Sequence, residues 1–178
     1  MANAAEMIDI YDDDRRFTGE RLPRKTKLGK GQYMLYVLAL IRNKEGKYLV
    51  TQRALDKKWA AGWWEIPGGG AMAGEDSLTA LKREVREETG INLTNANCKV
   101  LYSYKNYDEK GGDNYFADIY LAEADFTIDD VNVDRNEVIG LALADLDKIK
   151  QLHEETGFLH YERIMTALTD SKNENPAE

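Results

Sequence analysis

Runs of hydrophobic residues separated by polar turns predict strands along most of the chain. Residues 33–41 are continuously apolar, which is typical of a strand buried on both faces. Residues 47–53 alternate between apolar and polar after a turn at 43–46, so we expect them to form the partner strand. Further strands are expected over residues 63–66, 100–105 and 115–122, and a strand or loop over 137–144.

A helical period replaces this alternation over residues 77–89. The stretch contains neither proline nor glycine, and it lies between a candidate N-cap, Asp76 or Ser77, and a candidate C-terminal residue, Gly90. We therefore expect one helix here. Its apolar residues form a stripe that can pack on a sheet: Leu78, Leu81 and Val85.

The two ends of the chain are less regular. Residues 8–17 predict a short hairpin or an extended arm, and residues 18–31 a basic polar connector. Residues 145–153 and 154–168 are expected to be helical, with Gly157 weakening the join between them. The expected organisation is an N-terminal arm with its connector over 1–31, one domain over 32–170, and a disordered polar tail over 171–178.

The predicted helix carries a second, acidic face. Glu84, Glu87 and Glu88 are spaced i, i+3 and i+4, so they share one side of the helix. Three carboxylates so close repel one another, and hard oxygen ligands suit Mg²⁺ or Mn²⁺. Arg83 can pair with Glu75 or Glu87 and hold a carboxylate in place. The glycines at 68–70 follow a proline, and their backbone can approach a metal or a phosphate closely.

The spacing of these residues is highly specific. Gly69 to Ile91 matches, at every specified position, the pattern glycine, five residues, Glu, seven residues, Arg-Glu-apolar-any-Glu-Glu-any-Gly-apolar. Nine positions are restricted, so a chance match at one starting point is on the order of 10⁻⁹ or rarer. The segment resembles the Nudix box, and Ile8 to Leu168 resembles a Nudix hydrolase domain. This resemblance implies an α+β fold, an α/β/α sandwich around a mixed β-sheet, with the box as loop-helix-loop.

The same resemblance implies a reaction and a set of residues. It implies that a divalent metal promotes the attack of water on a diphosphate linked to another moiety. Nucleotides, ADP-ribose and nucleotide sugars are then the expected substrates, with Mg²⁺ as cofactor and Mn²⁺ as a substitute. The matching metal ligands are Glu84, Glu87, Glu88 and the carbonyl of Gly69, supported by Arg83 and Glu75. We expect Arg83 to orient the cluster and help balance phosphoryl charge, and Glu84 or Glu137 to act as general base.

The sequence leaves two alternative functions to consider. Tyr11 to Gly19 and the strands that follow resemble the branch related to isopentenyl-diphosphate isomerase. That enzyme would need a reactive cysteine before the box and a histidine-rich metal site, whereas residues 64–70 contain neither and His153 and His160 lie far downstream. A non-catalytic nucleotide sensor of the same fold is the other alternative, and it would be expected to lose some box carboxylates.

Residues outside the box have less specific candidate roles in catalysis or binding. Glu137 is a candidate ligand or base, with Asp129, Asp130 and Asp134 as competitors. Arg53 ends a predicted strand and can bind a phosphate through its guanidinium, and Glu65 can face the same pocket. The remaining aromatic residues are interpreted mainly as packing residues, with base stacking as the alternative for the tyrosines: Trp59, Trp63, Trp64, Tyr102, Tyr104, Tyr107 and Tyr115.

Composition agrees with one compact enzyme. The 178 residues are 43% hydrophobic, enough for a full core. A net charge of −8 argues against a protein that coats long nucleic acids. The single cysteine, Cys98, fits a reducing compartment, and the longest apolar run is too short to cross a membrane. With no hydrophobic leader at the N-terminus, a cytoplasmic enzyme with a small-molecule substrate is expected. A homodimer through the N-terminal arm is a further expectation.

Overall fold

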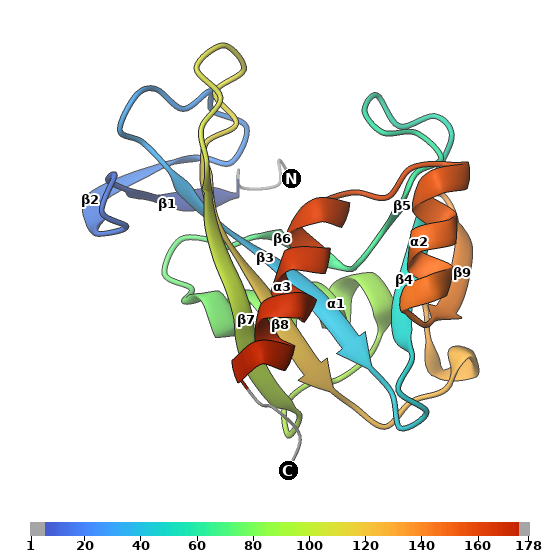
Figure 1. The fold of residues 1–178 in the computed structure, drawn as a ribbon. Coiled ribbons are helices and arrows are strands. Elements are labelled where there is room, and N and C mark those ends of the chain that lie inside the picture. Colours follow the sequence, from blue (N-terminus) through green and yellow to red (C-terminus); the bar gives the residue numbers. More distant parts are fainter. Residues whose placement is uncertain (1–5, 175–178) are drawn as a thin grey trace, which may run out of the picture.

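The computed structural model describes residues 6–174 as strands and helices in an α+β arrangement (Figure 1). The strands are β1 (Met7–Tyr11), β2 (Phe17–Pro23), β3 (Met34–Arg42), β4 (Tyr48–Arg53), β5 (Trp64–Glu65), β6 (Gly68–Gly70), β7 (Asn97–Asn106), β8 (Tyr115–Glu123) and β9 (Val138–Ala144). The helices are α1 (Ser77–Thr89), α2 (Leu146–Glu155) and α3 (Tyr161–Glu174), with a 3-10 turn η1 (Ile128–Asp130). Within residues 6–174 no helix is long and apolar enough to cross a membrane.

The main sheet is mixed and splits into two parts. In the first part β3 runs parallel to β8 and antiparallel to β6, and β7 pairs antiparallel with β8. In the second part β4 pairs antiparallel with β5 and β9. The two parts are joined by a single pair of residues, Arg42 and Tyr48, after which β3 and β4 diverge. Loops and side chains can therefore enter the sheet between β6 and β4.

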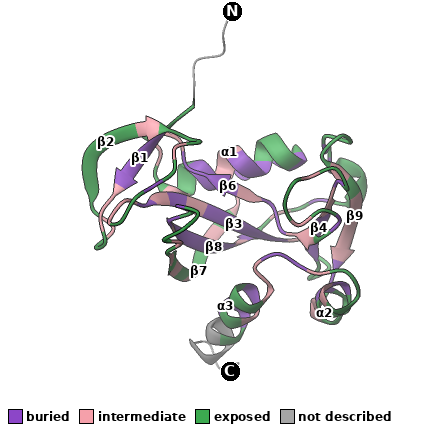
Figure 2. Cartoon of the chain, turned by 90° about the horizontal axis from the view of Figure 1, so that it is seen from above, coloured by how far each residue is buried: buried purple, intermediate pink, exposed green. Residues whose placement is uncertain are grey.

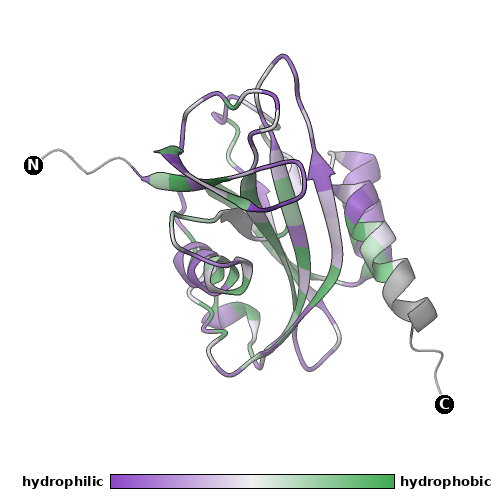
Figure 3. Cartoon of the chain, turned by 90° about the vertical axis from the view of Figure 1, so that its left-hand side faces the viewer, coloured by the Kyte–Doolittle hydropathy of each residue, from purple (hydrophilic) through white to green (hydrophobic). Residues whose placement is uncertain are grey.

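Helices cover both faces of this sheet, which gives a three-layered sandwich (Figure 2). Along β3, Leu35, Val37 and Ala39 pack in the cluster that includes α1, whereas Leu38 and Leu40 pack in the cluster that includes α2 and α3. Figure 3 shows the strands, with their hydrophobic stretches in green, between α1 and α3. The predicted burial of this strand on both faces and the predicted fold class are both confirmed.

Helix α1 begins and ends as predicted. The Asp76 side chain accepts a hydrogen bond from the Thr79 backbone N–H, and Gly90 adopts the left-handed conformation with φ 75°. Leu81 and Val85 are fully buried, but Leu78 is 38% exposed, so its place in the packing stripe was predicted wrongly. It lies in the first turn, at the margin of a buried face that instead includes the carboxylate residue Glu84.

The ends of the chain differ from the expectation in two places. Residues 17–23 form β2, which pairs with β1, so the connector is shorter than 18–31. The pattern hid this strand because β2 is almost wholly exposed and has no apolar alternation. At the other end α3 extends to Glu174, into the expected disordered tail, since residues 171–174 contain no proline or glycine to stop it. Residues 175–178 of that tail lie outside the described residues, and the homodimer stays a prediction.

A buried ion pair ties the N-terminal hairpin to the domain. Arg15, in the turn between β1 and β2, has a φ of 62° and donates to both oxygens of Asp118 at 2.8 and 2.5 Å. Ser77 and Ser103 donate to the same carboxylate, whose side chain is 5% exposed. Burial alone would raise the pKa of Asp118, but these hydrogen bonds outweigh burial and lower the pKa below its usual range.

We expect Arg15→Ala to lower the free energy of unfolding by about 1–3 kcal/mol. The substitution leaves a buried carboxylate without its cation, and the estimate is reduced because the Arg15 side chain is 34% exposed. Urea unfolding at neutral pH measures the change. Arg16→Ala is the control, because Arg16 pairs only with the exposed Asp14 and should shift stability little. Equal effects of the two substitutions would contradict this role of Arg15.

Candidate active site

The predicted site residues come together where β3 and β4 diverge. A cavity of about 320 Å³ lies there, between α1, the strands β4 and β5, and the segment leading into β9. Its carboxylates are Glu65, Glu84, Glu87, Glu88, Asp134 and Glu137, and its cationic side chains are Arg53 and Lys57. Negative charge is therefore concentrated around one cavity, with two cations among the carboxylates.

The glycine strand β6 brings the backbone into contact with α1. A Cβ atom at Gly69 would lie 2.4 Å from the carboxyl carbon of Glu84, and one at Gly68 would lie 2.2 Å from the carbonyl oxygen of Val37. Gly69 pairs with Val37 in the sheet, so this backbone is held firmly. A side chain at Gly68 would clash with the backbone of β3, and one at Gly69 would displace the Glu84 carboxylate.

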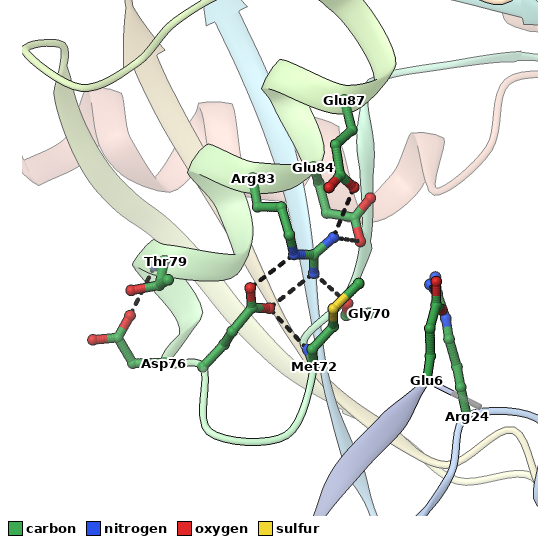
Figure 4. A network of polar contacts seen from close by, with 10 residues as sticks. Glu6, Arg24, Gly70, Met72, Asp76, Thr79, Arg83, Glu84 and Glu87 are labelled. Carbon is green, nitrogen blue, oxygen red and sulfur yellow. Dashed lines mark hydrogen bonds and ion pairs between the residues drawn. The ribbon is translucent and has the colours of Figure 1, made fainter. Parts of the chain in front are cut away.

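Arg83 organises the acidic side of the cavity (Figure 4). It donates to both oxygens of Glu75 at 2.7 and 2.8 Å, to Glu84 at 2.8 Å, to Glu87 at 3.1 Å and to the Gly70 carbonyl oxygen at 3.0 Å. These bonds use all five N–H donors of a guanidinium. The Arg83 hydrogen bond to Glu75 lowers the pKa of that carboxyl. Arg83 is therefore placed to orient the carboxylates and has no donor left for a ligand.

Glu88 binds the glycine strand at Gly68, whereas the Arg83 network binds it at Gly70. Its carboxylate accepts the backbone N–H of Gly68 at 2.9 Å. Glu88 is exposed at the surface, but protein atoms around its carboxyl partly desolvate it, and Glu84, Glu65 and Glu137 add repulsion, so the pKa of Glu88 is raised to about 8. Three negatively charged neighbours thus act on a single carboxylate, which is the electrostatic situation that a bound cation relieves.

The residues fit a hard divalent cation by their chemistry. Carboxylate oxygens dominate the cavity, and oxygen ligands are those that Mg²⁺ and Mn²⁺ prefer. Over the part of the chain that the structure describes, no three acidic, histidine or cysteine side chains form a ready-made metal cluster. Arg83 and the Gly68 N–H hold the glutamates of α1 instead. Glu87 is exposed and can rotate toward a cation that arrives with a substrate.

The raised pKa of Glu88 predicts that proton release accompanies Mg²⁺ binding near pH 7. The folded protein favours the protonated carboxyl, so this group's contribution to stability is complete below its ordinary pKa of 4.5 and is lost as pH rises through about 8. A metal ligand must be deprotonated, so we expect release of about one proton per ion at pH 7. Calorimetric titration with Mg²⁺ in buffers of different ionisation enthalpy counts the protons. Equal release from the Glu88→Gln variant would contradict this assignment.

Two cations bind carboxylates on the far wall of the cavity. Arg53 donates to Glu65 at 3.0 and 3.3 Å, and Lys57 donates to Glu137 at 2.8 Å. Burial raises the pKa of Glu65, and Arg53 opposes that rise. Lys57 was missed by sequence reasoning, because it lies in a polar loop with no periodic pattern and reaches the cavity only through the fold. Arg53, Glu65 and Glu137 all line this cavity.

The three aspartates considered as alternatives to Glu137 lie in different places. Asp134 lines the same cavity, whereas Asp129 and Asp130 belong to η1, where Asp130 accepts the backbone N–H and the hydroxyl of Thr127. Asp134 itself accepts the backbone N–H of Asn136 and shapes the turn before β9. Glu137 has Lys57 as its ion-pair partner and is otherwise open to the cavity. Glu137 is therefore the carboxylate of this segment with most freedom to act on a ligand.

The groups that an isomerase would need are not at this cavity. Cys98 lies within β7, at the outer edge of the sheet. His153 stacks on Tyr161, and His160 contacts the hydroxyl of Tyr104 at 3.2 Å. The predicted packing role of both histidines agrees with these contacts. Tyr104 and its neighbours form an aromatic cluster on the α3 side of the sheet: Tyr36, Tyr102, Tyr104 and Tyr115.

Comparison with curated proteins gives relatives of two kinds. An uncharacterized Nudix hydrolase of Listeria monocytogenes is 28% identical over 157 residues, which cover 88% of this chain and 89% of the relative. The CTP pyrophosphohydrolase of Escherichia coli is 43% identical over 61 residues, 34% of this chain and 44% of the relative. The isopentenyl-diphosphate Delta-isomerase of Corynebacterium diphtheriae is 30% identical over 114 residues, 61% of this chain and 62% of the relative.

Solved structures and a family model agree with the fold. The MutT NUDIX hydrolase from Burkholderia pseudomallei superimposes with a TM-score of 0.62 at 27% identity, covering 78% of this chain and 98% of that one. The model of the NUDIX domain matches residues 32–168, most of the chain, and includes the whole cavity. The carboxylates, the glycine strand and the arginine network lie within the matched residues. The chain therefore belongs to the NUDIX domain family and is an enzyme of the Nudix hydrolase type.

Proposed function

We propose that the protein hydrolyses the diphosphate linkage of a small nucleoside diphosphate derivative with Mg²⁺, for which Mn²⁺ can substitute. The gathering of six carboxylates and two cations around one cavity carries this proposal. Carboxylates alone repel a diphosphate, so the cavity suits a substrate that arrives with a divalent cation. The E. coli relative named as a CTP pyrophosphohydrolase supports a nucleotide as the organic part of the substrate.

In this proposal, the residues of the cavity have different roles in the reaction. Glu84, Glu87 and Glu88, with the Gly69 carbonyl, would hold the metal, which supplies charge neutralisation at phosphate oxygens and a more acidic water when bound. Arg83 keeps Glu84 and Glu87 oriented through its hydrogen bonds. Glu137 accepts the proton of the attacking water on a carboxylate oxygen. Glu84 is the less suitable base, because Arg83 already donates to it and its side chain is 8% exposed.

Arg53 and Lys57 bind the phosphates in this proposal. Without substrate they pair with Glu65 and Glu137. An entering diphosphate offers stronger acceptors to both cations. When Lys57 turns to a phosphate, Glu137 loses its partner and is free to take a proton. The carboxylates thus hold the two cations in place until the substrate replaces them.

Lys57→Ala is expected to raise KM about tenfold or more. The estimate follows from losing one charge-assisted hydrogen bond, worth about 1.5–3 kcal/mol. Steady-state kinetics with a confirmed substrate measures the effect. Lys58→Ala is the matched control, because this neighbour is exposed and does not line the cavity. A rise in KM of the same size in both variants would contradict the phosphate-binding role.

A release assay tests the proposed activity directly. Nucleoside di- and triphosphates, ADP-ribose, dinucleoside polyphosphates and nucleotide sugars are incubated with the protein and Mg²⁺ or Mn²⁺, and phosphate and nucleotide products are measured. The proposal expects metal-dependent cleavage of at least one compound at the diphosphate linkage. Nucleotide binding with no product after long incubation would favour the sensor alternative. Conversion of isopentenyl diphosphate without phosphate release would favour the isomerase alternative instead.

A further inference from the structure

Two of the three tryptophans near the cavity are explained by packing. Trp64 packs in the core on the α2 and α3 side of the sheet. Trp63 is 40% exposed, but its ring lies against Gly157, where a Cβ atom would come within 2.6 Å of it. Trp59 is different, because 64% of it is exposed, so it is not the packing residue that the sequence suggested. Single exposed apolar residues are common on protein surfaces, and the position of Trp59 is what distinguishes it.

Trp59 is held beside the cavity by Arg53. The guanidinium carbon of Arg53 lies 5.8 Å from the centre of the indole ring, and Nη2 donates to the Trp59 carbonyl oxygen at 3.4 Å. The Nη1 atom of the same guanidinium donates to Glu65 inside the cavity. One side chain therefore connects the cavity to the indole face, within the range of a cation–π contact.

The loop that carries Trp59 is closed firmly at its base. It joins β4 to β5 and projects away from the sheet (Figure 1). The Arg53 backbone N–H donates to the Trp63 carbonyl oxygen at 2.9 Å, and the Gln52 side chain donates to the Gly62 carbonyl oxygen at 2.9 Å. Lys57, in the same loop, binds Glu137 across the cavity. These contacts fix the base of the loop, and the loop carries Trp59 next to Arg53, which lines the cavity.

We propose that Trp59 stacks on the nucleobase of the substrate and so contacts the half of the molecule that carries no phosphate. The inference rests on the proposed function, because it takes Arg53 as a phosphate-binding residue. An α-phosphate bound to Arg53 would be joined to the base through one ribose, and Trp59 is an exposed aromatic residue whose ring lies 5.8 Å from that guanidinium. Stacking on an indole tolerates every base, since each has a π face. The site therefore selects for a base without discriminating strongly among bases.

Kinetics of matched variants test this contact. Trp59→Ala should raise KM for each hydrolysed nucleotide about 5- to 100-fold, while kcat changes little. This range corresponds to a stacking energy of about 1–3 kcal/mol. Trp59→Phe should retain most of the affinity. Inorganic tripolyphosphate has no base, so its inhibition of wild type and variants should be equal. Leu55→Ala is the control, because this residue of the same loop is 74% exposed and does not line the cavity.

A binding readout separates this proposal from the proposed activity. Tryptophan fluorescence is followed while ATP, CTP or ADP-ribose is added with Mg²⁺, and quenching is expected in wild type and lost in Trp59→Phe. If wild type quenches but hydrolyses none of these compounds, the proposed hydrolysis fails and the stacking contact stands. The stacking proposal is overturned if Trp59→Ala leaves nucleotide affinity unchanged, or if it weakens tripolyphosphate as much as nucleotides. Dissociation of an oligomer by Trp59→Ala alone, without a change in nucleotide affinity, would assign the indole to a protein interface and overturn it too.

Discussion

Replacing Glu87 with Gln should reduce turnover of a confirmed substrate by at least about 100-fold at saturating Mg²⁺. The amide keeps the size of the side chain but removes a negative charge from the acidic face of α1. Metal-ion catalysis supplies several kcal/mol of transition-state stabilisation, and each 1.4 kcal/mol is a factor of ten in rate. Initial rates across a range of Mg²⁺ concentrations measure the loss, and the half-saturating Mg²⁺ concentration should rise as well.

Folding is expected to be unaffected by this substitution. The Glu87 side chain is 57% exposed, and its one protein partner, Arg83, retains its other four hydrogen bonds. Circular dichroism and thermal unfolding should therefore match wild type. Glu162→Gln, on the exposed side of α3, is the control and should keep full activity. A Glu87→Gln protein that turns over substrate at the wild-type rate in Mg²⁺ would remove Glu87 from the set of metal ligands.

Arg83→Ala should lower activity about 10- to 100-fold and weaken Mg²⁺ binding by a similar factor. Residues that orient metal ligands without touching the metal have effects of this size. The substitution removes five hydrogen bonds at once and leaves Glu75, Glu84 and Glu87 without their shared cation. Kinetics over Mg²⁺ concentration and calorimetric Mg²⁺ titration measure the two effects.

Arg83→Lys tests whether Arg83 acts by orienting the carboxylates or by its positive charge alone. Lys at this position keeps the charge but cannot reproduce a bidentate contact with Glu75 and a contact with the Gly70 carbonyl together. Arg83→Lys should therefore recover only part of the lost Mg²⁺ affinity. Arg86→Ala is the control on the same helix, because Arg86 is exposed. Complete recovery by Lys would mean that charge alone is needed and would contradict the orienting role.

The candidate site could be proposed from the sequence because most of its residues are close together in the chain. Helix geometry fixes the relation of Glu84, Glu87 and Glu88, and the caps at Asp76 and Gly90 fix where the helix begins and ends. The continuous apolar run of β3 predicted a strand buried on both faces for the same reason, since its pattern is local. These features depend on backbone periodicity, which a single sequence displays directly.

The remaining features depend on how distant segments meet. Lys57 and Glu137 are 80 positions apart and are brought together by the pairing of β4 with β9. Arg15, in the turn between β1 and β2, binds Asp118 of β8, which is 103 positions away in the sequence. The strand β2 was missed because both its faces are exposed. Leu78 shares the helical face of Leu81 and Val85, but it lies in the first turn of α1 and is 38% exposed.

The close contact between Gly69 and Glu84 determines whether the Glu84 side chain loses its rotamer entropy during folding or during ion binding. A free glutamate side chain loses about 1.5–2 kcal/mol of rotamer entropy when it is fixed in one conformation. Glu84 is already confined by the β6 backbone and by Arg83 in the folded protein, so that entropy is lost during folding. A cation that binds there meets a side chain with little freedom left to lose. In the proposed metal site, this ordering would cost some folding stability and would reduce the entropy that is lost when the ion binds.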